Sequence, residues 1–115
     1  MLFRSENEAG RLDSFAIMLG NRKDLKGYIV VYAGRVACPG EAKVRGAKAR
    51  NYLIKIRGLD RTRIAAIDGG YREALSVELY AIPQDAEPPR IVPTIAPNKV
   101  EIIRSKRCNL VTDHR

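Results

Sequence analysis

The chain has 115 residues, a formal net charge of +8 and a hydrophobic content of 45%. A chain of this length forms at most one domain with one modest core. Its longest uninterrupted apolar run, residues 28–33, has the length of a strand, so the sequence predicts no transmembrane segment.

The positive charge is concentrated in residues 35–63, where nine lysines and arginines accompany only two acidic residues. Such an excess is compatible with nucleic acid, anionic lipid or an acidic polymer as a partner, and by itself it selects none of these. A solvated helix face without a partner is the simpler interpretation of the same pattern.

The first predicted element is a helix over residues 6–19. Ser5 and Glu8 have the spacing of a capping box, in which two side chains satisfy free main-chain N–H groups at the start of a helix. Gly20 and Asn21 are the expected end signal. Residues 2–4 are interpreted as the remnant of a first strand. The apolar residues of the helix recur at helical spacing and form one face: Leu12, Phe15, Ala16 and Leu19.

The next two elements are a buried strand and a second, basic helix. Residues 28–33 form a continuous β-branched and aromatic run, which is typical of a strand covered on both faces. The helix begins near Pro39 and ends before Gly58, the expected C-terminal glycine. Its apolar stripe is small at the start and large at the end, which predicts that the first half lies close to the sheet: Ala42, Gly46, Ala49, Leu53 and Ile56.

Two more strands complete the predicted domain, which spans residues 1–82. Residues 64–67 form a short buried strand, and residues 68–70, Asp-Gly-Gly, have the composition of a hairpin turn. Residues 75–82 alternate between apolar and polar side chains and predict a strand with one wetter face. The predicted fold is α/β (an α+β sandwich), with two helices packed on one face of a small mixed sheet.

The remainder of the chain is predicted to be less regular. Residues 83–97 contain five of the six prolines and are interpreted as an extended linker. Residues 98–115 are predicted to form a short strand and a basic, flexible tail.

The sequence contains no recognisable catalytic set, and we expect a non-enzymatic protein without a cofactor or metal. The single histidine, His114, lies in the predicted tail, and no glycine-rich phosphate-binding motif is present. Asp68 and Glu73 are close enough in sequence to form a carboxylate pair, although capping of the turn is the simpler role. Nucleic-acid binding is the alternative function, with Tyr52 and Tyr71 as the candidate stacking platforms.

The two cysteines, Cys38 and Cys108, allow two interpretations. They are either two unpaired thiols or a disulfide that closes a loop of about 70 residues and adds on the order of 4 kcal/mol. Their spacing does not decide between the two.

Several short motifs resemble the OmpA-like domain, the peptidoglycan-associated C-terminal domain of outer-membrane protein A. The family pattern is R-A-x-x-V-x-x-Y-L, a glycine followed by isoleucine or leucine, D-x-x-R/K-I, and a last strand that begins V-E. The resemblance covers about residues 5–82 and implies a βαβαββ fold, here with a short or truncated first strand. The similar runs are Arg45 to Leu53 (RGAKARNYL), Arg57 to Asp60 (RGLD), Arg63-Ile64, and Val77 to Leu79 (VEL).

The resemblance also implies a function. The family holds the peptidoglycan stem peptide non-covalently, through an arginine of the second helix and an aspartate in the loop after the second strand. Arg45 falls on the arginine position. The loop carries Arg35 and no carboxylate before Glu41, so the chain looks like a divergent member that lacks the ligand-binding aspartate. Its recognition of the stem peptide is therefore expected to be altered or lost.

The predicted binding residues lie at that loop, on the second helix and in the turn after the third strand: Arg45, Arg35, Tyr71, Arg72 and Glu73. For Arg72 the alternative is a turn residue that pairs with Glu73 or Glu78. We expect a binding or structural module that contacts peptidoglycan or another anionic cell-wall polymer. Its expected location is the periplasm or the outer membrane if a signal peptide precedes this sequence, and otherwise the cytoplasm.

Overall fold

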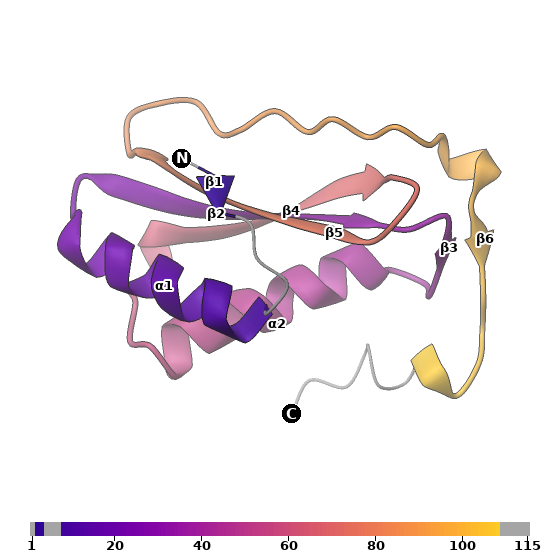
Figure 1. Cartoon of the computed structure of the whole chain (residues 1–115), viewed down its shortest axis with the longest axis horizontal. Helices are drawn as coiled ribbons and strands as arrows, with labels where there is room; N and C mark the ends of the chain where they lie inside the picture. Colours follow the sequence, from indigo (N-terminus) through magenta and orange to yellow (C-terminus); the bar gives the residue numbers. More distant parts are fainter. Residues whose placement is uncertain (1, 4–7, 109–115) are drawn as a thin grey trace.

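A computed structural model of the chain describes residues 2–3 and 8–108 (Figure 1). The predicted α/β class is confirmed, and the first strand is short. The capping box at Ser5 lies outside the described residues. Two 3₁₀ turns, η1 (Arg61–Arg63) and η2 (Pro97–Lys99), accompany the helices and strands, which are β1 (Leu2–Phe3), α1 (Glu8–Asn21), β2 (Leu25–Ala33), β3 (Val36–Ala37), α2 (Glu41–Lys55), β4 (Ile64–Tyr71), β5 (Ser76–Pro83) and β6 (Glu101–Ile102).

The main sheet has the strand order β1-β5-β2-β4. The central strand β2 is parallel to β4 and antiparallel to β5, so the sheet is mixed as predicted. Both helices lie on one face of this sheet (Figure 1). A separate parallel pair, β3 with β6, lies at one end of the molecule. No helix among the described residues is long and apolar enough to cross a membrane.

The core lies between the helices and the sheet. Every residue of β2 except Lys26 is buried, which agrees with the predicted strand covered on both faces. Burying a large apolar side chain contributes about 1.5–3 kcal/mol, and the core is the main source of stability in a domain of this size. The largest fully buried apolar side chains of this cluster are Phe15, Leu19, Ile29, Val31, Leu53 and Leu79.

Gly46 is the point where α2 approaches the sheet, as the small-to-large stripe predicts. A Cβ atom added at Gly46 would lie 3.2 Å from the Cβ of Ala66 and 3.6 Å from Cγ2 of Val31. A larger side chain there would separate the helix from β4.

The predicted hairpin turn at residues 68–70 is wrong. β4 continues through these residues to Tyr71, and the turn to β5 comes after it. The β2 partner of Asp68 is Val31 and that of Gly70 is Tyr32, so Gly69 is the extra residue of a bulge. A Cβ at Gly69 would lie 2.5 Å from Cε1 of Tyr32, and Gly70 has a φ of 96°. Gly69 therefore allows the Tyr32 ring to lie against the strand, Gly70 supplies a positive φ, and the two glycines do not form a turn.

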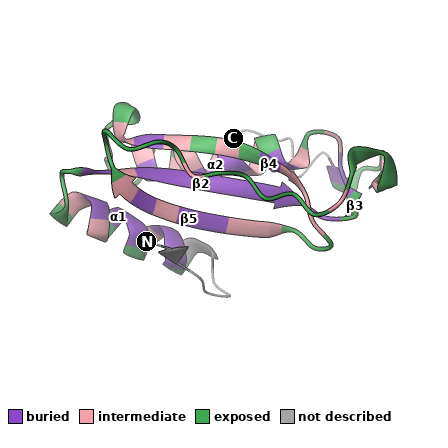
Figure 2. Cartoon of the chain, turned by 90° about the horizontal axis from the view of Figure 1, so that it is seen from above, coloured by how far each residue is buried: buried purple, intermediate pink, exposed green. Residues whose placement is uncertain are grey.

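The segment after β5 crosses the face of the sheet opposite the helices (Figure 1 and Figure 2). We call residues 84–99 the strap. The strap is extended, as predicted for a linker, and most of its residues are exposed. It nevertheless contacts the sheet: the Val92 N–H donates to the Tyr32 hydroxyl at 2.9 Å, and the Thr94 N–H donates to the Tyr71 carbonyl at 2.9 Å. The strap therefore covers the face of β2 that lies opposite the helices.

The C-terminal part of the described chain is joined to the body at two places. β6 pairs with β3, and Cys108 forms a disulfide with Cys38. The short strand predicted after residue 98 is confirmed. Residues 109–115, which belong to the predicted flexible tail and contain His114, lie outside the described residues.

Candidate functional site

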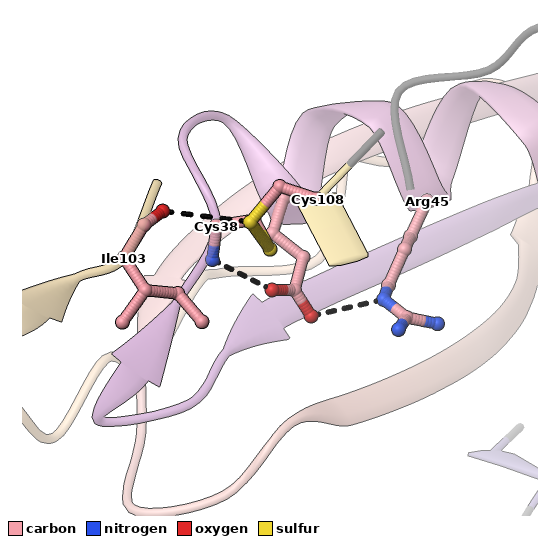
Figure 3. The surroundings of a disulfide bond; sticks show 5 residues. Cys38, Arg45, Ile103 and Cys108 are labelled. Carbon is pink, nitrogen blue, oxygen red and sulfur yellow. Dashed lines mark hydrogen bonds and ion pairs between the residues drawn. A yellow bond between two sulfur atoms is a disulfide. The ribbon is translucent and has the colours of Figure 1, made fainter. Parts of the chain in front are cut away.

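The disulfide lies at the start of α2, close to Arg45 (Figure 3). Glu41 connects the two: its Oε1 accepts the N–H of Cys38 at 2.9 Å, and its Oε2 accepts Nε of Arg45 at 3.0 Å. The Sγ of Cys108 lies 3.4 Å from the carbonyl oxygen of Ile103, next to β6. One carboxylate therefore fixes both the loop after β3 and the arginine that the sequence singles out.

Arg45 presents its guanidinium group to solvent. Its side chain is 37% exposed, while that of Glu41 is 12% exposed. Among the described residues, no hydrogen bond or ion pair engages the two terminal nitrogens of Arg45. A guanidinium held at Nε and open at its other nitrogens binds a carboxylate or phosphate well, because its planar fork matches two oxygens.

No role was assigned to Glu41 from the sequence. The signal was present, since Glu41 and Arg45 have the i, i+4 spacing that favours an ion pair on a helix. The contact with the Cys38 N–H had no such signal, because it depends on the path of the loop before the helix.

Arg35 and Glu73, both predicted site residues, form an exposed ion pair. Nη2 of Arg35 lies 2.5 Å from Oε1 of Glu73, and Nε donates to Oε2 at 3.1 Å. The Arg35 side chain holds the pKa of the Glu73 carboxyl below its usual value, mainly through the side-chain hydrogen bonds. Arg35 was predicted to be a binding residue of the loop after β2, and Glu73, in the turn after β4, supplies its counter-charge.

Arg72 lies on the strap side of the sheet. Its Nη1 donates to Oε2 of Glu78 at 3.0 Å, and its Nε donates to the Val92 carbonyl at 3.1 Å. Its guanidinium carbon lies 3.6 Å from the centre of the Tyr32 ring, a cation–π contact. The sequence left Glu73 and Glu78 as possible partners of Arg72, and in the structure Arg72 pairs with Glu78.

Residues 75–82 were predicted to form a strand with one more solvent-exposed face. In the structure, Glu78 of β5 lies on this face and is buried. This residue is 5% exposed, and its Oε1 accepts the Tyr80 hydroxyl at 2.8 Å. Burial, and then the hydrogen bond to Glu78, raise the pKa of Tyr80. The carboxylate is tolerated in the interior because Arg72 and Tyr80 satisfy it.

The two candidate stacking rings have other contacts. The Tyr52 hydroxyl donates to Oδ1 of Asp13, and this hydrogen bond raises the pKa of Tyr52. Tyr71 packs against the apolar core, and its carbonyl accepts the N–H groups of Thr94 and Ile95. Neither ring is presented as a flat, open surface on which a base stacks.

Two of the cations in the basic region, residues 35–63, bind main-chain carbonyls. Arg50 donates to the carbonyls of Ile64 and Arg61, each at 3.0 Å. Arg63 donates to those of Arg22 and Leu25, at 2.8 and 2.7 Å. These arginines stabilise the start of β4 and the loop before β2, so part of the basic character has a structural purpose.

The described part of the chain contains no group of three or more histidine, cysteine, aspartate or glutamate side chains that could hold a metal ion. The disulfide is typical of proteins that reside in an oxidising compartment.

Comparisons of the chain with protein-family models, with curated proteins and with solved structures each find no match. The candidate site is therefore defined by its geometry: the exposed guanidinium of Arg45, held by Glu41 at the start of α2.

Proposed function

We propose that this chain is a non-enzymatic binding module of the bacterial cell envelope, of OmpA-like type. It contacts peptidoglycan or another anionic envelope polymer through Arg45. The observation that carries the proposal is the pairing of Arg45 with Glu41, which fixes one side of the guanidinium and leaves the other side open. Arg45 is also the residue on the family's arginine position.

Two further observations support the proposal. Without the short strand β3, the elements from Leu2 to Pro83 follow the order β-α-β-α-β-β that the resemblance implies. The disulfide agrees with a periplasmic or outer-membrane location, because thiols are kept reduced in the cytoplasm.

The ligand group that suits Arg45 is an anion such as a carboxylate of the stem peptide. Glu73 neutralises Arg35, so the loop after β2 repels the ammonium end of a zwitterion less than its sequence suggests. Of the predicted site residues, Arg45 is the one whose guanidinium is best placed to accept an anion.

The test is co-sedimentation of the protein with purified sacculi, with and without free stem peptide as a competitor. Arg45→Ala should abolish retention, while Lys55→Ala, an exposed lysine on the same helix, should retain it. The melting temperature of Arg45→Ala should fall little, because a partly exposed ion pair contributes less than about 1 kcal/mol. Unchanged retention of Arg45→Ala would remove this residue from the site.

The same protein preparation distinguishes the proposed function from the alternative, nucleic-acid binding. A cytosolic basic domain that binds nucleic acid would ignore sacculi and shift DNA or RNA in a gel. That shift would weaken steeply with added salt, because phosphate binding releases counterions.

A further inference from the structure

A groove of about 470 Å³ lies between α2 and β4, away from Arg45. Its volume is within the range of about 300–1,000 Å³ that is usual for ligand-binding pockets. Five of its eleven lining residues are glycine or alanine, which leaves room for the side chains of another molecule. The small residues that line it are Ala42, Gly46 and Ala47 of α2, and Ala65 and Ala66 of β4.

One wall of this groove is an edge strand. β4 is the last strand of the sheet and pairs with β2 on one side only. The two ends of its outer edge are occupied: Arg50 binds the carbonyl of Ile64, and the strap binds the carbonyl of Tyr71. Of the six residues between these ends, residues 65–68 line the groove.

The outer edge of residues 65–68 offers main-chain groups to a partner. Carbonyl and N–H groups of alternate strand residues point to the same side, so those of Ala66 point outward like the carbonyl of Ile64. Such an edge is a template for another strand, and proteins usually block it with charges, prolines or a covering segment. Here the blocking is limited to the two ends.

The charge of the groove favours an acidic partner. Lys43 and Arg50 line it from α2 against one carboxylate, Asp68, whose Oδ1 already accepts the N–H of Gly70. A second copy of the chain would bring a like-charged helix to this edge, since most of the net charge lies in residues 35–63. Charge complementarity therefore selects an acidic polypeptide over a second copy.

We propose that this groove binds an extended segment of an acidic partner protein, which adds to β4 as a further strand. Main-chain hydrogen bonds to Ala66 supply affinity, and Lys43 and Arg50 select acidic side chains. The proposal concerns a different surface from the Arg45 site and does not depend on the proposed envelope function.

The probe is a fluorescein-labelled peptide of alternating glutamate and valine residues, measured by fluorescence anisotropy on the full chain. Ala47→Phe should fill the groove, and Lys43→Glu should reverse its charge. We expect each to weaken binding about tenfold or more, since truncated or repelled interface contacts have effects of this size. Lys55→Glu is the matched control, because it makes the same charge change on α2 outside the groove and should leave the affinity nearly unchanged.

A second peptide, N-methylated at every residue, has the same charge and cannot donate main-chain hydrogen bonds to β4. It should not bind. Equal binding of both peptides, or equal losses in Lys43→Glu and Lys55→Glu, would show unspecific charge attraction and overturn the proposal. Failure of the acidic peptide to bind would also overturn the proposal. A dimer of the chain that Ala47→Phe dissociates would overturn it too, because a second copy would then occupy the groove.

Discussion

The two faces of the central sheet are covered in different ways. The face under α1 and α2 is apolar, with Phe15, Ile29 and Leu79 in one continuous core. The opposite face carries a polar cluster of Tyr32, Glu78, Arg72 and Tyr80. The extended strap crosses this face (Figure 2). Alternate residues of β2 point to the two faces of the sheet. The difference between the faces therefore depends on the segments that cover them, which are the helices on one side and the strap on the other.

The comparison shows two ways to stabilise one sheet. Apolar burial is non-directional and scales with area, so the helical face gains stability from many contacts of similar weight. The strap is held by a small number of directional contacts, each worth about 1 kcal/mol net, and most of its side chains stay exposed. Near its far end, the pairing of β6 with β3 and the disulfide to Cys38 keep this weakly held segment in place.

The largest expected effect tests the helical face. Phe15→Ala should lower the free energy of unfolding by about 4 kcal/mol, because Phe15 is fully buried and its loss leaves a cavity. Urea denaturation followed by circular dichroism measures it. Val92→Ala on the strap, where the side chain is 57% exposed, is the matched comparison and should change stability by less than about 0.5 kcal/mol. Similar losses for the two variants would contradict the proposed contrast between the faces.

The next effect tests the polar cluster. Arg72→Ala should cost about 3 kcal/mol, because it leaves the buried Glu78 carboxylate without its cation and removes the contact with Tyr32. The double variant Arg72→Ala with Glu78→Gln should regain part of this loss, since no buried charge remains. If Glu78→Gln gives no recovery, the cost of Arg72→Ala comes from the strap and ring contacts and not from the carboxylate.

The smallest effect is at the exposed pair of Arg35 and Glu73. Arg35→Ala should raise the pKa of the Glu73 carboxyl back toward its ordinary value, because the hydrogen bonds that lower it are gone. A pKa lowered in the folded state contributes stability above the unfolded pKa, and this contribution disappears as the pH falls through the folded pKa. Any stability difference between Arg35→Ala and the original chain should therefore vanish in acid. An NMR titration of the Glu73 side chain measures the shift, and an unchanged pKa would mean that the ion pair does not form in solution.

Much of the fold could be predicted from the sequence because hydrophobic periodicity is a local property. The two helices, the continuous central strand and the close approach at Gly46 follow from spacing and residue size. The prediction failed at Gly69 and Gly70, where composition indicated a turn. Glycine is needed at position 69 because the Tyr32 ring of another strand lies against the chain, and at position 70 because φ is positive; the sequence shows neither.

The candidate site was predictable only in part. The position of Arg45 came from a resemblance, and its partner Glu41 was visible as an i, i+4 pair. The partner of Arg72 could not be assigned, because Glu73 and Glu78 were both within reach. The partner of Arg35 could not be assigned either, because Glu73 lies 38 residues away in the sequence. The function, the family and the acidic partner of the β4 groove stay predictions that the experiments above decide.

The sequence alone determined the α/β class, the helix-covered face and the concentration of positive charge on and around α2. Only the tertiary structure decided that the proline-rich segment covers the open face, that Cys38 meets Cys108, and that Arg50 and Arg63 bind main-chain carbonyls. The spacing of apolar residues along the sequence indicates which side of a helix or strand is buried. The choice of partner for a charge or a thiol depends on where distant parts of the chain meet, and this is set only when the whole domain has packed.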